Sequence, residues 1–141
     1  MEICFGGCGG MYHYFLGIVE VLQQHFNHHL TNPHLDLIFT GTSAGCFPAL
    51  ILTAQVDIRK AQIEWNLPLL RKVNSKLTKS LFNWNNNVRE STKAYLPHDI
   101  SIYNNKFHCH ISQIKNPLKL KLKRHTICRW KDIDELLDGV M

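Results

Sequence analysis

The chain has 141 residues, of which 45% are hydrophobic and 19% are charged. This composition is typical of a globular protein with a packed core and excludes a disordered chain. The formal net charge is +5 at pH 7, and no run reaches the ~18 apolar residues that a membrane-spanning helix needs.

The N-terminal third predicts a strand, a loop and a helix in that order. The strand covers residues 2–5, which are mostly apolar. Residues 6–10 include four glycines and one cysteine, a composition that suits a loop rather than a helix or strand. Apolar residues from Phe15 to Phe26 then recur at helical spacing. Asn32-Pro33 marks the turn that follows this helix.

The middle of the chain predicts a second strand and two more helices. Residues 35–40 form a short apolar run between turn signals, which is typical of a buried strand. A helix begins near Ala44, and Pro48 is tolerated because it falls near the first turn. Asp57 is expected to cap a further helix, which Pro68 then disturbs.

The last third predicts two strands and a final helix. Residues 74–98 are polar and read as loop and short helix, and strands are expected at 106–114 and 117–125. Asp132 begins the final helix, with Glu135 completing a capping box. In the second of these strands one face is apolar and the other basic, because three leucines alternate with Lys119, Lys121 and Lys123.

The alternation of strands and helices predicts a single α/β domain over residues 1–141. Its sheet is expected to be mainly parallel and covered by helices on both faces, which makes three α/β/α layers. Loops at the carboxyl ends of parallel strands meet at one edge of such a sheet. The glycine loop at 6–10 and the turn after the second strand are therefore expected to face each other.

The second strand runs into Gly41-Thr42-Ser43-Ala44-Gly45, which fits the nucleophile-elbow pattern GxSxG. In such a turn the serine hydroxyl is lifted above the N-terminus of the next helix. Glycine is needed at Gly41 and Gly45 because side chains there would collide with the strand and helix. The strand before and the helix after support Ser43 as a nucleophile. The alternative is that Ser43 only caps the helix.

The glycine loop suits an oxyanion hole. Acyl transfer needs donors aimed at the developing negative charge, and backbone amides of Gly7, Cys8, Gly9 and Gly10 are placed to supply them. A dinucleotide-binding loop is the rival interpretation, and a ligand-free tight turn is another. The GxGxxG register puts Tyr12 at the third glycine position, which weighs against the dinucleotide interpretation.

These two loops resemble those of the patatin-like phospholipases, in particular the animal adiponutrin-like and triglyceride-lipase-like branch. The resemblance implies a patatin-like fold that is C-terminally incomplete here. It also implies a lipase or phospholipase that cleaves lipid esters through an acyl-serine formed by Ser43, without metal or cofactor. The family usually has a basic residue and a glycine where this chain has Met11 and Tyr12.

The same resemblance implies that an aspartate, rather than a histidine, takes the proton from the serine. In the family this aspartate stands in an Asp-Gly-Gly or Asp-Gly-Ala turn. The chain offers only Asp138-Gly139, which lies in a helical pattern. The base is therefore expected outside the chain, and Asp138 is the alternative. A triad of the serine with His98 and Asp99 is a further, less favoured arrangement.

Five scattered cysteines suit free thiols in an intracellular protein, cytoplasmic or peripheral to membranes. No metal site is expected, although His25 and His29 have helical spacing. Expected partners are a lipid substrate and an anionic membrane or lipid droplet, and nucleic acid is not expected. The alternative functions are a degenerate, non-catalytic domain that binds lipid or a partner, and a nucleotide-binding α/β protein.

Overall fold

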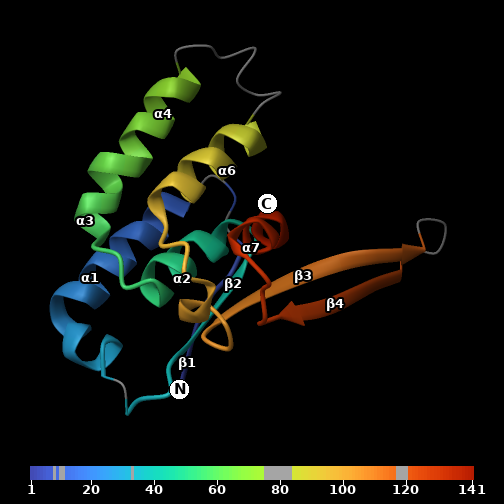
Figure 1. The fold of residues 1–141 in the computed structure, drawn as a ribbon, viewed down its shortest axis with the longest axis horizontal. Coiled ribbons are helices and arrows are strands. Elements are labelled where there is room, and N and C mark those ends of the chain that lie inside the picture. Colours follow the sequence, from blue (N-terminus) through green and yellow to red (C-terminus); the bar gives the residue numbers. More distant parts are fainter. Residues whose placement is uncertain (8, 10–11, 33, 75–83, 117–120) are drawn as a thin grey trace.

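The sheet has four strands in the order β1-β2-β3-β4. In the computed structural model, which describes residues 1–7, 9, 12–32, 34–74, 84–116 and 121–141, β1 pairs in parallel with β2, and β2 with β3. β3 and β4 pair antiparallel and form a long hairpin that extends away from the helices (Figure 1). The expectation of a mainly parallel α/β sheet is confirmed. The strands are β1 (Glu2–Phe5), β2 (Ile38–Thr42), β3 (Phe107–Asn116) and β4 (Lys121–Ile127).

The helices connect these strands and pack together beside the sheet (Figure 1). A 3₁₀ turn, Ser43–Gly45, joins β2 to α2, and a π-helical turn, Gln62–Asn66, joins α3 to α4. None of the helices in the described part of the chain is long and apolar enough to cross a membrane. The helices are α1 (Tyr12–Leu30), α2 (Cys46–Thr53), α3 (Ile58–Ala61), α4 (Leu67–Asn74), α6 (Trp84–Tyr95) and α7 (Ile133–Val140).

Helices cover one face of the sheet. Phe5 of β1 contacts Phe15 of α1, with ring centroids 5.5 Å apart. On the same face of β3, the Cys109 thiol lies 3.6 Å from the Cys46 sulfur of α2 and donates to the Gly139 carbonyl of α7 at 3.3 Å. On the other face Thr40 is buried and donates a hydrogen bond to the Glu2 carboxylate, and the exposed residues are Glu2, Cys4, Thr42, His110 and Ser112.

Within the described residues, the expectation of helices on both faces is therefore wrong. The reason is topological. Right-handed crossovers that step in one direction along the sheet, from β1 to β2 to β3, leave all their helices on the same side. A reversal of strand order is needed to place helices on the second face.

Some expected boundaries shift because local hydrogen bonds compete with the pattern. β2 begins at Ile38 rather than at residue 35, because the Leu37 amide donates to the Leu35 carbonyl at 2.8 Å and closes a tight turn. The helix that begins after Asp57 continues through Pro68. The π-helical turn just before it widens the helix where proline lacks a donor.

Two predicted helix caps are confirmed. The Asp57 carboxylate accepts from the amides of Arg59 and Lys60 at 2.8 and 3.0 Å. The Asp132 carboxylate accepts from the Glu135 amide at 2.8 Å and begins α7.

Two sequence expectations for the last half need revision. Of the polar stretch at 74–98, residues 84–95 form the three-turn helix α6, which packs against α7. The last strand begins at Lys121, so Lys119 and the first half of the predicted leucine-lysine alternation lie outside the described residues.

Candidate active site

Ser43 stands on a sharp turn between β2 and α2. Its φ angle is +53°, in the left-handed region that non-glycine residues rarely adopt. Such a backbone costs about 1–3 kcal/mol and persists where the surrounding structure imposes it. The turn has the strand-to-helix form that the sequence predicted.

The two flanking glycines are required by space. A Cβ on Gly41 would lie 2.7 Å from the Cys46 amide nitrogen, where α2 begins. A Cβ on Gly45 would lie 2.5 Å from the Phe5 carbonyl oxygen, at the end of β1. Both distances are shorter than real Cβ contacts, and the obstructing atoms belong to the backbone. The turn is therefore clamped between the ends of β1 and α2.

The glycine loop lies against this turn, as expected for two loops at the carboxyl ends of parallel strands. A Cβ on Gly7 would lie 3.6 Å from the Ser43 Cβ. Gly9 has a φ of +53°, a conformation that favours glycine. Cys8, Gly10 and Met11 lie outside the described residues, so their part in an oxyanion hole stays a prediction.

Tyr12 occupies the position where the resembling family has a glycine. It begins α1 and is not among the described residues with positive φ, so the helix start accommodates it without that strain. Its hydroxyl donates to the Asn66 Oδ1 at 2.7 Å. Burial raises the pKa of Tyr12 to about 12, which keeps the hydroxyl protonated at neutral pH.

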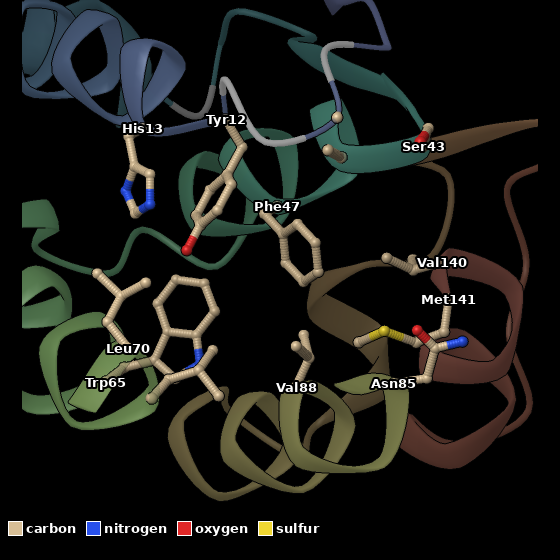
Figure 2. A pocket seen from close by; sticks show the side chains of 13 residues that line it. Tyr12, His13, Ser43, Phe47, Trp65, Leu70, Asn85, Val88, Val140 and Met141 are labelled. Atoms are coloured by element: carbon tan, nitrogen blue, oxygen red, sulfur yellow. The ribbon is translucent and has the colours of Figure 1, made fainter. Parts of the chain in front are cut away.

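A cavity of about 600 Å³ opens beside Ser43 (Figure 2). This volume is within the range of small-molecule sites. Ser43, Val140 and Met141 lie on one side of it, and His13 and Leu70 lie on the opposite side. None of the described residues that line it is an Asp, Glu, Lys or Arg. Its apolar wall comes from four helical segments and comprises Ala44, Phe47, Trp65, Leu69, Leu70, Val88, Val140 and Met141.

None of the alternative partners of Ser43 within this chain, namely Asp138, His98 and Asp99, lines this cavity. The Asp138 carboxylate is exposed on α7 and pairs with the Arg89 Nε at 3.0 Å. His98 Nε2 lies 2.7 Å from the Lys93 carbonyl, and Asp99 caps the next turn.

His13 does line the cavity, but on the side away from Ser43 (Figure 2). Its Nδ1 lies 3.3 Å from the Asn66 Nδ2. The His13 ring therefore contacts Asn66 rather than Ser43 and is not placed to take the serine proton.

Two buried thiols lie near the serine turn, one at the start of α2 and one on β3. Cys46 and Cys109 are at most 1% exposed, and their sulfur atoms lie 3.6 Å apart. The contact with Cys109, together with burial, raises the pKa of the Cys46 thiol and keeps it protonated. Among the described residues, no group of three or more His, Cys, Asp or Glu side chains is placed to hold a metal ion.

Sequence reasoning did not identify Phe47, Trp65 and Val88 as cavity residues, nor Asn66 as the hydrogen-bond partner of Tyr12. Their spacing indicates helix faces but not which faces meet. Only Phe47 and Trp65 carried a signal in the sequence, because large aromatic side chains are usually buried and often contact one another in a core.

No protein-family model, curated protein or solved structure matches this chain.

Proposed function

We propose that this protein is a lipid acyl hydrolase of the patatin-like type, with Ser43 as its nucleophile. The observation that carries the proposal is the left-handed Ser43, clamped between Gly41 and Gly45 on the wall of an apolar cavity. Strained residues of this kind cluster at functional sites. A serine that only capped α2 would have an extended backbone and a bond from its side chain to the helix, whereas the structure shows no side-chain cap at either end of this turn.

The proposed chemistry uses the elements around this turn. The Ser43 Oγ attacks the ester carbonyl carbon, and its proton passes to a base. Backbone amides of residues 7–10 donate to the oxyanion. The intermediate collapses when the base returns the proton to the departing alcohol, and water then cleaves the acyl-serine by the same steps in reverse.

The described cavity wall does not supply the base that this chemistry needs. None of the eleven acidic residues is in the described cavity wall, and Asp138 is held by Arg89. An aspartate that joined the cavity beside Val140 and Met141 would stand on the same side as Ser43 (Figure 2). This is the dyad arrangement that the family resemblance implies.

Contact with an anionic lipid surface is a further part of the proposal. Lys123 and Arg124 are exposed on β4, on a hairpin that extends away from the helices (Figure 1). No acidic residue occurs between Asp99 and Asp132. A basic, protruding element of this kind is attracted to anionic headgroups.

A second candidate function is lipid binding without catalysis. It is favoured by one observation, which is that no described carboxylate touches the cavity that contains Ser43. A serine hydroxyl without an adjacent base is a weak nucleophile.

The test is labelling of the purified chain with a fluorophosphonate probe. Wild type is compared with Ser43→Ala and with Ser112→Ala, which removes an exposed serine of β3 as a matched control. Labelling of wild type and Ser112→Ala, but not of Ser43→Ala, supports an activated Ser43. Absence of labelling in a folded wild-type chain contradicts hydrolysis by this chain alone and favours the binding candidate.

A further inference from the structure

The cavity continues past two side chains in its middle. Phe47 of α2 and Val88 of α6 face each other there and form a central pair (Figure 2). Ser43 lies on one side of this pair, and His13 and Leu70 lie on the other. The same cavity is lined by residues on both sides of the pair. A molecule that extends from Ser43 toward Leu70 therefore passes between the Phe47 ring and the Val88 methyl groups.

Phe47 is held in place by its aromatic neighbours. Its ring contacts the rings of Tyr12 and Trp65, with centroids 6.0 Å apart in each pair. Aromatic contacts of this kind contribute stability beyond the burial of their area. The Phe47 side of the passage therefore cannot move aside without loss of these contacts.

Val88 is held in place by the helix that carries it. The residue is 4% exposed and lines the cavity, and a valine in a helix keeps largely one side-chain rotamer. The next residue, Arg89, donates to the Asp134 Oδ1 at 2.7 Å and to the Asp138 Oδ1 at 3.0 Å, which ties α6 to α7. The width of the passage therefore depends on the size of the side chain at position 88.

The walls on both sides of the central pair suit a hydrocarbon chain. Val140 and Met141 lie toward Ser43, and Trp65 and Leu70 lie away from it (Figure 2). None of the described lining residues is an Asp, Glu, Lys or Arg. A charged group would lose its hydration there without a partner of opposite charge. The long apolar arm of a simple lipid ester is its acyl chain, so this is the part that fits beyond the central pair.

We propose that the central pair controls which acyl chains this cavity accepts, and that Val88 is the residue that determines the longest chain. The inference rests on the proposed function, because Ser43 defines where the ester carbonyl lies. Each methylene that enters apolar space strengthens binding by roughly 4-fold. Affinity should therefore rise with chain length until the chain fills the space beyond Val88.

The experiment measures binding of straight-chain methyl ketones, with chains from butyl to decyl, by isothermal titration calorimetry. These ketones keep the carbonyl and the apolar chain of an ester but cannot be hydrolysed. Wild type is compared with Val88→Phe, which narrows the passage, and with Val88→Ala, which widens it. Val21→Phe is the matched control, because it adds the same ring on the exposed face of α1, outside the described cavity wall.

Wild type, Val21→Phe and Val88→Ala should show the same rise in affinity with chain length. Val88→Phe should bind the shortest ketones as wild type does, but the decyl ketone roughly 10-fold or more weakly, because several methylenes no longer enter. An unchanged rise in Val88→Phe overturns the inference. An equal loss at every chain length does so too, because it indicates a structural role only.

A second measurement uses the methyl resonances of Val88 and Leu70 in wild type, so it does not depend on the folding of a variant. As the ketone chain lengthens, the Val88 resonances should move at a shorter chain length than those of Leu70. A response of Leu70 first, or no response of Val88, overturns the inference.

The outcomes separate this inference from the proposed hydrolysis. If wild type shows the expected order but the fluorophosphonate probe does not label it, the passage stands and hydrolysis by this chain alone fails. If Ser43 is labelled but every ketone binds with equal affinity, or none binds, hydrolysis stands and the inference fails.

Discussion

Replacement of Gly45 by alanine tests whether the serine turn is clamped as the structure shows. Gly45 has φ −67° and ψ −13°, a helical conformation that alanine adopts freely. Any loss of stability therefore comes from space and not from backbone preference. The added Cβ would lie 2.5 Å from the Phe5 carbonyl oxygen, and the Gly6 carbonyl is also in its way.

The expected loss is large because backbone atoms, not flexible side-chain ends, block the methyl group. Overpacking of this kind costs roughly 2–3 kcal/mol. For a chain of this size, the loss corresponds to a melting temperature lower by roughly 8–12 °C. Thermal unfolding followed by circular dichroism measures it directly.

Gly17→Ala is the matched control. Gly17 is an exposed glycine within α1, and no atom lies within 4 Å of the position its Cβ would take. Alanine there should stabilise the helix by up to ~1 kcal/mol. If Gly45→Ala melts at or above the wild-type temperature, β1 and the serine turn are not in contact, and the reasoning about the clamp fails.

Three further outcomes are expected. Because the pKa of Tyr12 is about 12 when folded and 10.0 when free, the unfolded chain loses this proton first. Stability should therefore fall between pH 10 and 12 by up to about 3 kcal/mol, and Tyr12→Phe should show a smaller fall in urea unfolding across that range. Asp132→Ala removes the cap of α7 and should lower the free energy of unfolding by roughly 1 kcal/mol; an unchanged urea midpoint would refute the cap. In native protein, iodoacetamide should modify the exposed Cys4 but spare Cys46 and Cys109, which are buried. Mass spectrometry of the digested protein measures the modification of each cysteine, and alkylation of Cys46 or Cys109 would contradict their burial.

The elements with strong periodicity were predictable because their signals are local. β1, α1 and the cap at Asp57 appear where the sequence indicates them. β2 was misplaced at its start because the turn at Leu35 competes with the strand. The extent of α6 was missed because its polar surface residues hide a narrow buried face that includes Val88.

The sequence could not predict that the described helices cover one face of the sheet. The strand pattern predicts which residues alternate, but the side on which each helix packs follows from strand order. That order depends on β3 adding beside β2, a pairing between Thr40 and His108 that no local pattern specifies.

The sequence by itself determined the shape of the serine turn. A side chain at Gly41 would collide with the Cys46 backbone, so this part of the turn is fixed locally, whereas Gly45 is crowded by the Phe5 carbonyl of β1. Only the tertiary structure decided what surrounds it. The cavity wall combines segments that are far apart in the chain, and Asp138 faces Arg89 rather than Ser43 because α7 packs against α6. Such contacts depend on which helix faces meet. The hydrophobic effect favours burial of apolar surface without specifying a partner, so the local sequence does not indicate which faces pack together.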